Sequence, residues 1–341
     1  MFICILVLLM IGVTMPVVIV DPFFQYHKPL KNFPYRIDNQ INQNPGMAKH
    51  FEYDSVILGS SITDNFNVDK FFEYMGLKTL KLSANGAMPK DIDELLKVVN
   101  IGHSNVDKVF LGIDIFLYHD EPETTAYPLP EYLYDRNVIN DAPYLINDEV
   151  ITDYVLYPMI KREGTPLNEI YCNWKQMSYG REFVWTYFTK PEIIAKEMSP
   201  DAYIPAVKEN LEKHILPYVE KMKDTEFVVF FPPYSILMWY LEYADGELAA
   251  DICSTKYIVE RLLEYDNVSV YYFQNDYEYI TNLDNYCDSK HFAYQKNDDM
   301  TLEFSKKDSI YIIDGDNYEE VLDEFDRYLH NCNYEDYLNW N

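Results

Sequence analysis

The chain has 341 residues, a length that suits one large α/β domain with an insertion, or two small domains. Its net charge is −28, from 28 Lys and Arg against 56 Asp and Glu. A surface this acidic repels phosphate groups, which argues against nucleic acid as a partner and against electrostatic docking on anionic lipid. The 32 Tyr could line a carbohydrate-binding groove, and nucleotide bias in the source genome explains their number equally well.

The N-terminal segment is apolar. Residues 2–20 (FICILVLLMIGVTMPVVIV) carry no charge and have about the length that a bilayer needs. Because no small-residue cleavage site follows, residues 1–20 are predicted to be a retained transmembrane anchor, with a buried N-terminal helix as the alternative. Basic residues follow this segment and none precedes it, a pattern that by itself would keep the following domain in the cytoplasm. Because a short basic stretch could precede the segment, charge alone leaves the orientation open.

The rest of the chain shows an alternation of strand and helix patterns. Residues 21–53 are rich in Pro, Asn and aromatic residues and are predicted to form an ordered but irregular lead-in. A domain from 54 to 331 follows, with a tail at 332–341. Short apolar runs predict strands at 54–59, 78–82, 108–113, 226–231 and 268–273. Helical patterns occupy the stretch through about 75 and about 89–100, 205–223, 237–265 and 318–330.

This alternation indicates right-handed βαβ units. The predicted fold is therefore a three-layer α/β/α sandwich around a central parallel sheet. Residues 117–203 interrupt the alternation and are aromatic and irregular, with helical pieces. They could form an insertion that caps the strand ends or a small separate helical subdomain.

The first candidate for chemistry is Ser61, directly after the first predicted strand. Its hydroxyl would lie at the carboxyl edge of the sheet, where open α/β sheets bind ligands. Its backbone N–H would lie at the start of a helix, suited to stabilise an oxyanion. Ser61-x-x-Asp64 also has the pattern of a helix capping box, and the two roles do not exclude each other.

The second candidate is the pair Asp288 and His291. A serine hydroxyl needs a base, and the base needs a third group that fixes its tautomer. Asp and His three residues apart could both face one site, although a polar surface loop has the same pattern. His119-Asp120-Glu121 resembles part of a metal cluster but has one His only, so it is interpreted as a solvated loop, and no metal site is predicted.

The third set lies in the turns after the second and third strands. Asn85-Gly86 and Gly112-Ile113-Asp114 fall where an oxyanion hole would be built. Gly86 could offer an unobstructed backbone N–H, and ordinary turn chemistry explains both motifs as well.

Taken in order, these motifs resemble the SGNH (GDSL-like) hydrolase superfamily, whose flavodoxin-like fold is the sandwich predicted above. The matching blocks are Gly59-Ser60-Ser61, Gly86, Gly112-Ile113-Asp114 and Asp288-x-x-His291. The resemblance implies that Ser61 is the nucleophile, His291 the base and Asp288 its partner. It also implies that Gly86, Asn85 and Asp114 belong to the oxyanion and binding region, and that no cofactor is needed.

The chain looks closer still to bacterial membrane-anchored proteins of this type. The shared segments are an aromatic lead-in at 21–27, a G-[ST]-S-x-T-[ED]-N-F element at 59–66 and an F-P-P-Y-S element at 231–235. This similarity implies a single-pass protein whose domain lies on the outer face of the cytoplasmic membrane. Implied partners are a surface polysaccharide or other acylated polymer and a membrane-bound O-acyltransferase.

The expected function is thus a serine esterase or O-acyltransferase that acts on acyl esters of a cell-surface polymer. The alternative is a non-catalytic SGNH-like module that binds such a polymer or partners an acyltransferase. Two departures from the family pattern bear on this choice: Ser60 replaces the first-block Asp, and Asp114 replaces the third-block Asn. An ionised Asp114 has no proton to donate to an oxyanion, so it is expected to be protonated, to orient another group, or to leave the oxyanion to backbone N–H groups.

Overall fold

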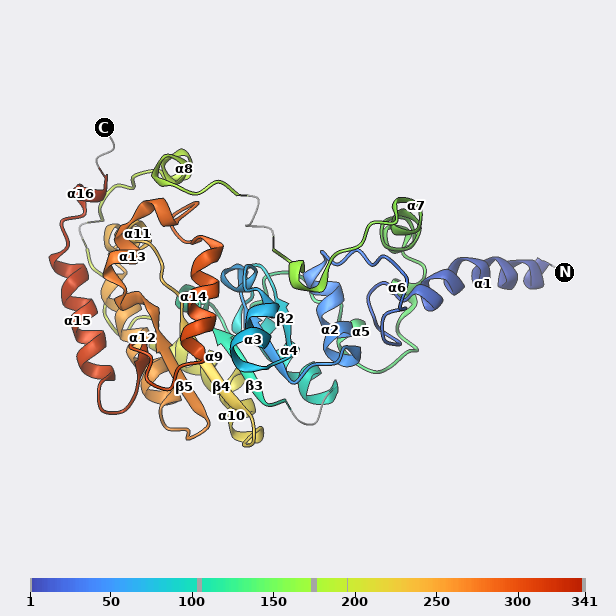
Figure 1. Cartoon of the computed structure of the whole chain (residues 1–341), viewed down its shortest axis with the longest axis horizontal. Helices are drawn as coiled ribbons and strands as arrows, with labels where there is room; N and C mark the ends of the chain where they lie inside the picture. Colours follow the sequence, from blue (N-terminus) through green and yellow to red (C-terminus); the bar gives the residue numbers. More distant parts are fainter. Residues whose placement is uncertain (1, 103–105, 173–176, 195, 339–341) are drawn as a thin grey trace.

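The computed structural model describes residues 2–102, 106–172, 177–194 and 196–338 (Figure 1). Six strands form one sheet in the order β2-β1-β3-β4-β5-β6. Their bounds are β1 (Ser55–Gly59), β2 (Thr79–Ser83), β3 (Lys108–Gly112), β4 (Glu226–Phe231), β5 (Val268–Tyr272) and β6 (Ile312–Ile313). The first five are parallel and β6 is antiparallel to β5. The prediction of an α/β fold with a mostly parallel sheet is confirmed, and the order of the first five strands is that of doubly wound flavodoxin-like sheets.

Helices surround this sheet and also form the N-terminal part of the molecule (Figure 1). The α-helices are α1 (Phe2–Val20), α2 (Gln40–His50), α3 (Val68–Met75), α4 (Pro89–Gly102), α5 (Glu131–Tyr134), α6 (Ala142–Leu145), α7 (Tyr157–Lys161), α8 (Arg181–Tyr187), α9 (Ile204–His214), α10 (Leu216–Lys221), α11 (Ile236–Ala244), α12 (Leu248–Leu262), α13 (Tyr277–Thr281), α14 (Tyr294–Phe304), α15 (Tyr318–Asn331) and α16 (Glu335–Leu338). The chain also has the 3-10 helices η1 (Ser61–Thr63) and η7 (Leu283–Asn285) and the π-helix η3 (Val150–Leu156).

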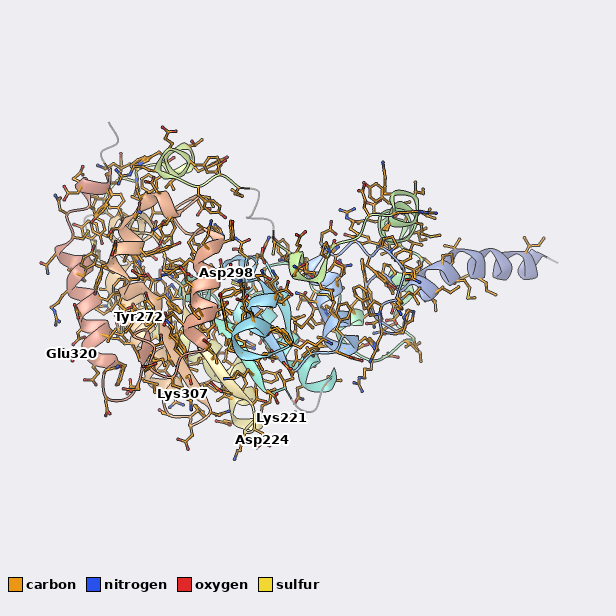
Figure 2. The ribbon with its side chains drawn as sticks, viewed as in Figure 1. Lys221, Asp224, Tyr272, Asp298, Lys307 and Glu320 are labelled. Carbon is orange, nitrogen blue, oxygen red and sulfur yellow. The ribbon has the colours of Figure 1, made fainter. Side chains whose placement is uncertain are left out.

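Both faces of the sheet are covered, as adjacent residues of β5 show. Tyr271 packs on Phe304 of α14, with 5.1 Å between ring centroids, and Tyr272 packs on Phe325 of α15 at 5.7 Å. Because successive side chains of a strand point to opposite faces, α14 and α15 lie on opposite faces of the sheet. Tyr272 is fully buried in this layer, whereas Glu320 on the outer side of α15 is exposed (Figure 2).

Two predicted helices are divided in the structure. The helix expected at 205–223 ends at His214 and resumes as α10, which has Pro217 in its first turn, where the missing N–H costs no hydrogen bond. The helix expected at 237–265 is interrupted at Gly246, which has a φ of +72°. A Cβ at Gly246 would lie 2.8 Å from the carbonyl oxygen of Lys196, so the turn requires glycine for both conformation and space.

The lead-in is less irregular than predicted, because residues 40–50 form α2. Pro45 and Gly46 favour a turn, but both lie inside this helix, which begins after the Asn39 cap. A Cβ at position 46 would lie 1.9 Å from the carbonyl oxygen of Phe23. The backbone at Phe23 therefore packs directly on α2, and this contact stabilises the helix against its local turn signal.

The insertion up to Tyr171 packs on the lead-in. Tyr144 stacks on Phe23, with 5.2 Å between ring centroids, and its hydroxyl donates to Asp21 at 2.9 Å. The Tyr171 hydroxyl donates to Asn44 of α2 at 2.9 Å. Because the buried apolar side chains of lead-in, insertion and sheet form one continuous core, the insertion is not a separate subdomain with its own core.

Residues 2–20 form the single helix α1, whose last turn buries Val17 and Val20. Within the described part of the chain, no helix meets the length and apolarity that crossing a bilayer requires. The predicted anchor thus has no support from the structure and stays a prediction.

Candidate active site

The structure brings Ser61, His291 and Asp288 together at the carboxyl edge of the sheet. Ser61 follows β1, and Asp288 and His291 lie in the segment between η7 and α14. The Ser61 Oγ lies 2.8 Å from the His291 Nε2, and the His291 Nδ1 lies 2.7 Å from the Asp288 Oδ2. The three side chains form one uninterrupted chain of hydrogen bonds between residues that are far apart in the sequence.

The turn that carries Asp288 and His291 is fixed by its own hydrogen bonds. The Asp288 Oδ1 accepts the backbone N–H groups of Lys290, at 2.8 Å, and His291, at 2.7 Å. The Cys287 N–H donates to the His291 carbonyl at 3.0 Å, which closes the turn from the other side. One carboxylate oxygen therefore holds the backbone while the other reaches the imidazole, which explains why a spacing of three suits this pair.

The electrostatics favour an ionised Asp288 carboxylate that orients the His291 ring. Burial alone would raise the pKa of Asp288, but the hydrogen bond and charge of His291 and the two backbone donors outweigh burial and lower it. An ionised Asp288 accepts a hydrogen bond from the Nδ1 only when that nitrogen carries the proton. The Nε2 is then left as an acceptor for the Ser61 hydroxyl, the arrangement that a general base requires.

The capping role considered for Ser61 is not observed. Ser61 begins η1, a 3-10 helix of three residues, and its hydroxyl contacts His291. The Asp64 Oδ1 accepts a hydrogen bond from the Gln40 side chain at 2.9 Å. The helix expected after β1 is divided, because η1 covers only Ser61–Thr63 and α3 begins at Val68, so the Ser61 N–H lies at the start of one short 3-10 turn.

The loop after β2 lies against the end of β1. The Ala84 N–H donates to the Gly59 carbonyl at 3.0 Å, and Gly86 has a φ of +67°, which favours glycine. The Asn85 N–H donates to the Gln40 Oε1 at 2.8 Å and is therefore engaged. Gln40 of α2 thus holds both this loop and Asp64, a contact that sequence reasoning missed. The backbone N–H groups of Ser61 and Gly86 stay the predicted oxyanion donors.

Asp114 is an acceptor on two sides. Its Oδ2 accepts the Ser60 hydroxyl at 3.1 Å and lies 2.9 Å from the Lys290 ammonium. Of the three explanations for an Asp at this position, the geometry favours the one in which it orients another group. Sequence reasoning also missed the role of Lys290 as the partner of Asp114. Two signals were present in the sequence: a lysine between Asp288 and His291, and an aspartate where the family has asparagine.

The interpretation of residues 119–121 as a solvated loop is wrong for His119. Asp120 and Glu121 are exposed, but the His119 ring stacks on Tyr203 at 3.8 Å between centroids and lies 3.6 Å from the buried Asp251. Burial lowers the pKa of His119 to about 4. Among the described residues no group of three or more His, Cys, Asp or Glu is arranged to hold a metal ion.

The second half of the insertion reaches the site. The Gly180 N–H donates to the Tyr286 carbonyl at 2.9 Å, just before Asp288 in the chain. Burial, with a smaller contribution from the charge of Asp288, raises the pKa of Tyr179. This part of the insertion thus contacts the segment that carries Asp288, whereas the part up to Tyr171 packs on the lead-in. The cap over the strand ends stays a prediction.

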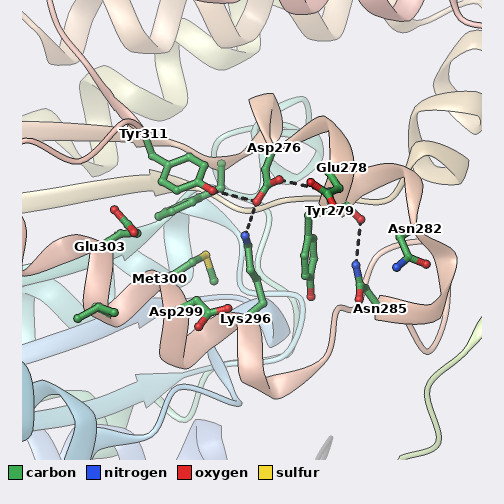
Figure 3. Close-up of a pocket in the computed structure, with 12 residues that line it drawn as sticks. Asp276, Glu278, Tyr279, Asn282, Asn285, Lys296, Asp299, Met300, Glu303 and Tyr311 are labelled. Carbon is green, nitrogen blue, oxygen red and sulfur yellow. Dashed lines mark hydrogen bonds and ion pairs between the residues drawn. The ribbon is translucent and has the colours of Figure 1, made fainter.

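A cavity of about 400 Å³ is lined in part by Asn285 and Lys296, which flank the segment of Asp288 and His291 in the chain (Figure 3). Its wall includes Lys296, whose ammonium contacts Asp276 at 2.6 Å and lies 4.3 Å from the centre of the Tyr279 ring. The Tyr311 hydroxyl donates to the same Asp276 oxygen at 2.9 Å. Lys296 lies in α14, five residues after His291, so this largely buried ion pair fixes the helix that follows the Asp288–His291 turn.

The chain was also compared with known proteins. No protein-family model matches it, and no curated protein is significantly similar to it in sequence. The resemblance to SGNH hydrolases therefore rests on the ordered motifs, and the assignment of this site to a reaction rests on its geometry.

Proposed function

We propose that the protein is a serine esterase or O-acyltransferase of the SGNH type, acting on acyl esters of a cell-surface glycan or similar polymer. The observation that carries this proposal is the uninterrupted Ser61–His291–Asp288 hydrogen-bond chain, with distances of 2.8 and 2.7 Å. These are distances at which a base can take the proton of a nucleophile.

In the proposed reaction the Ser61 hydroxyl attacks the ester carbonyl while His291 accepts its proton. The tetrahedral intermediate collapses when the proton passes from His291 to the leaving alcohol, which leaves an acyl group on Ser61. Asp288 holds the imidazole and stabilises its charged form. Attack by water then gives hydrolysis, and attack by a sugar hydroxyl gives acyl transfer.

The pairing of Asp114 with Lys290 weakens the main argument for the non-catalytic alternative. The alternative, a non-catalytic binding module, was favoured by the carboxylate of Asp114 beside the expected oxyanion. Because Lys290 pairs with Asp114 at 2.9 Å, that negative charge is opposed within the site. The membrane anchor, the outer-face location and the acyltransferase partner rest on the resemblance alone, and the proposed chemistry does not depend on them.

The test is covalent labelling with a serine-directed fluorophosphonate, followed by mass spectrometry to locate the adduct. Wild-type protein should carry the adduct on Ser61, and Ser61→Ala should lose it. Ser289→Ala is a matched control, because Ser289 lies in the same turn and accepts the Ser235 hydroxyl through its backbone carbonyl, which the substitution keeps. Full labelling of Ser61→Ala would contradict the proposal. Binding of an acetylated polysaccharide without labelling or loss of acetate would favour the binding module.

A further inference from the structure

Asp114 connects the two halves of the site at a second point. It accepts from Ser60, the residue before the nucleophile, and it pairs with Lys290, the residue before the base. Its side chain is 4% exposed and that of Lys290 is 23% exposed, so both are largely removed from solvent. A Ser60–Asp114–Lys290 chain thus runs beside the Ser61–His291–Asp288 chain, one residue earlier at both ends.

We infer that Asp114 and Lys290, with Ser60, form a positioning clamp that sets the distance between the nucleophile and the base. The clamp also places the positive charge of Lys290 next to the carboxylate of Asp114, close to Ser61. This inference rests on the proposed function, which names Ser61 and His291 as the reacting pair. It assigns a positioning role to Asp114, whose carboxylate by itself is unfavourable beside an oxyanion.

The need for a second attachment follows from the reaction itself. The Ser61–His291 hydrogen bond is lost when Ser61 becomes acylated, so it cannot hold the base in place through a whole catalytic cycle. The Lys290–Asp114 contact involves neither reacting atom and persists at every step. The Ser235 hydroxyl adds a bond of 2.5 Å to the Ser289 carbonyl, so the turn is held from the ends of both β3 and β4.

The surroundings of Lys290 make the ion pair strong enough for this role. Its ammonium lies 5.3 Å from the centre of the Phe116 ring and 5.6 Å from that of Tyr234. Burial, followed by the charge of Asp114, raises the pKa of Tyr234 well above its ordinary value, which marks this corner as poorly solvated. In such surroundings an unpaired Asp114 would be costly and would repel the developing oxyanion.

The experiment compares Lys290→Met, Lys290→Arg and the double variant Lys290→Met/Asp114→Asn with wild type. The matched control is Lys108→Met. Lys108 is 25% exposed and pairs with Glu226 at 2.5 Å, but at the amino ends of β3 and β4, the opposite edge of the sheet. The readouts are the rate of fluorophosphonate labelling, the thermal midpoint and the hydrogen exchange of residues 285–293.

Lys290→Met should label about 10- to 100-fold more slowly, the loss expected when a reacting group is misplaced by about 1 Å. Exchange of residues 285–293 should become faster, while Lys108→Met should match wild type in both readouts. Lys290→Arg should restore most of the rate. The double variant should label faster than Lys290→Met because it removes the unpaired charge along with its partner.

Two results would overturn the clamp. One is a Lys290→Met variant with the wild-type labelling rate and exchange. The other is a rate loss that follows only a fall in the thermal midpoint and that Lys290→Arg does not restore, because the pair would then act on stability alone. Wild-type protein that is not labelled at Ser61 contradicts the proposed function instead, and the exchange of residues 285–293 still tests the clamp in that case.

Discussion

The molecule contains two aspartate–histidine pairs in very different surroundings. Asp288 and His291 are 2.7 Å apart, their side chains are 32% and 18% exposed, and backbone N–H groups donate to the carboxylate. Asp251 and His119 are 3.6 Å apart and nearly or fully buried, at 0% and 10% exposure. In the described part of the chain no N–H group donates to the side chain of Asp251.

These surroundings give the two pairs opposite electrostatics. Hydrogen bonds lower the pKa of Asp288 despite burial, whereas burial and then the charge of Glu242 raise the pKa of Asp251 well above its ordinary value. Burial also raises the pKa of Glu242, to about 7, and lowers that of His119, to about 4. At neutral pH Asp288 of the first pair is an ionised carboxylate, whereas the second pair is a neutral acid beside a neutral ring. Donors and solvent, rather than residue types, decide which pair can serve as a base.

The largest expected effect concerns the two histidines. His291→Gln should lower ester hydrolysis by at least about 10⁴-fold, since it removes the base, whereas His119→Gln should leave the rate within about twofold of wild type. Initial rates with a chromogenic acetate ester measure both, and circular dichroism checks the folding of both variants. If both variants lost ester hydrolysis to the same extent, His291 would not differ from His119 in function, and the assignment of His291 as the base would be contradicted.

Much of the sheet could be predicted because its strands carry local signals. β4 has the predicted bounds, since an apolar run ended by two prolines marks a buried parallel strand. β6 was missed because two residues carry no periodicity. α2 was missed because Pro45 and Gly46 indicate a turn, and only tertiary contacts such as that of Gly46 with Phe23 favour the helix.

The site was predictable to the extent that its geometry is local. The spacing of Asp288 and His291 within one turn can be read from the sequence, and so can the position of Ser61 after a strand. The contact between Lys290 and Asp114 depends on how two distant loops meet, which no local pattern encodes. The same holds for His119, whose neighbours come from α12 and from the end of the insertion.

A smaller effect concerns the stability of the buried pair. Because the pKa of Asp251 is raised in the folded state, folding at neutral pH requires proton uptake, and the free energy of unfolding falls as the pH rises above the ordinary carboxyl value. Asp251→Asn should therefore increase the free energy of unfolding at pH 7 by about 2 kcal/mol, below the linkage maximum of about 4 kcal/mol for one proton between pH 4 and 7.

Urea unfolding as a function of pH tests this prediction. The gain of Asp251→Asn should shrink as the pH falls and vanish below about pH 4, where Asp251 is protonated in both folded and unfolded chains. If Asp251→Asn increased the free energy of unfolding equally at every pH, Asp251 would be ionised in the folded protein. The difference in pKa between Asp251 and Asp288 described above would then be wrong. Ester hydrolysis by the variant should match wild type throughout.

The smallest effect concerns the ring that covers His119. Tyr203 stacks on His119 at 3.8 Å, and its hydroxyl donates to Glu247 at 2.5 Å. Tyr203→Leu should lower the free energy of unfolding by about 1 kcal/mol, the contribution of a stacked ring pair, and Tyr203→Phe should lower it less because the stack remains. Neither should change ester hydrolysis. If Tyr203→Leu slowed hydrolysis while Tyr203→Phe did not, the His119 region would act on the Ser61 site, and the two pairs would not be independent.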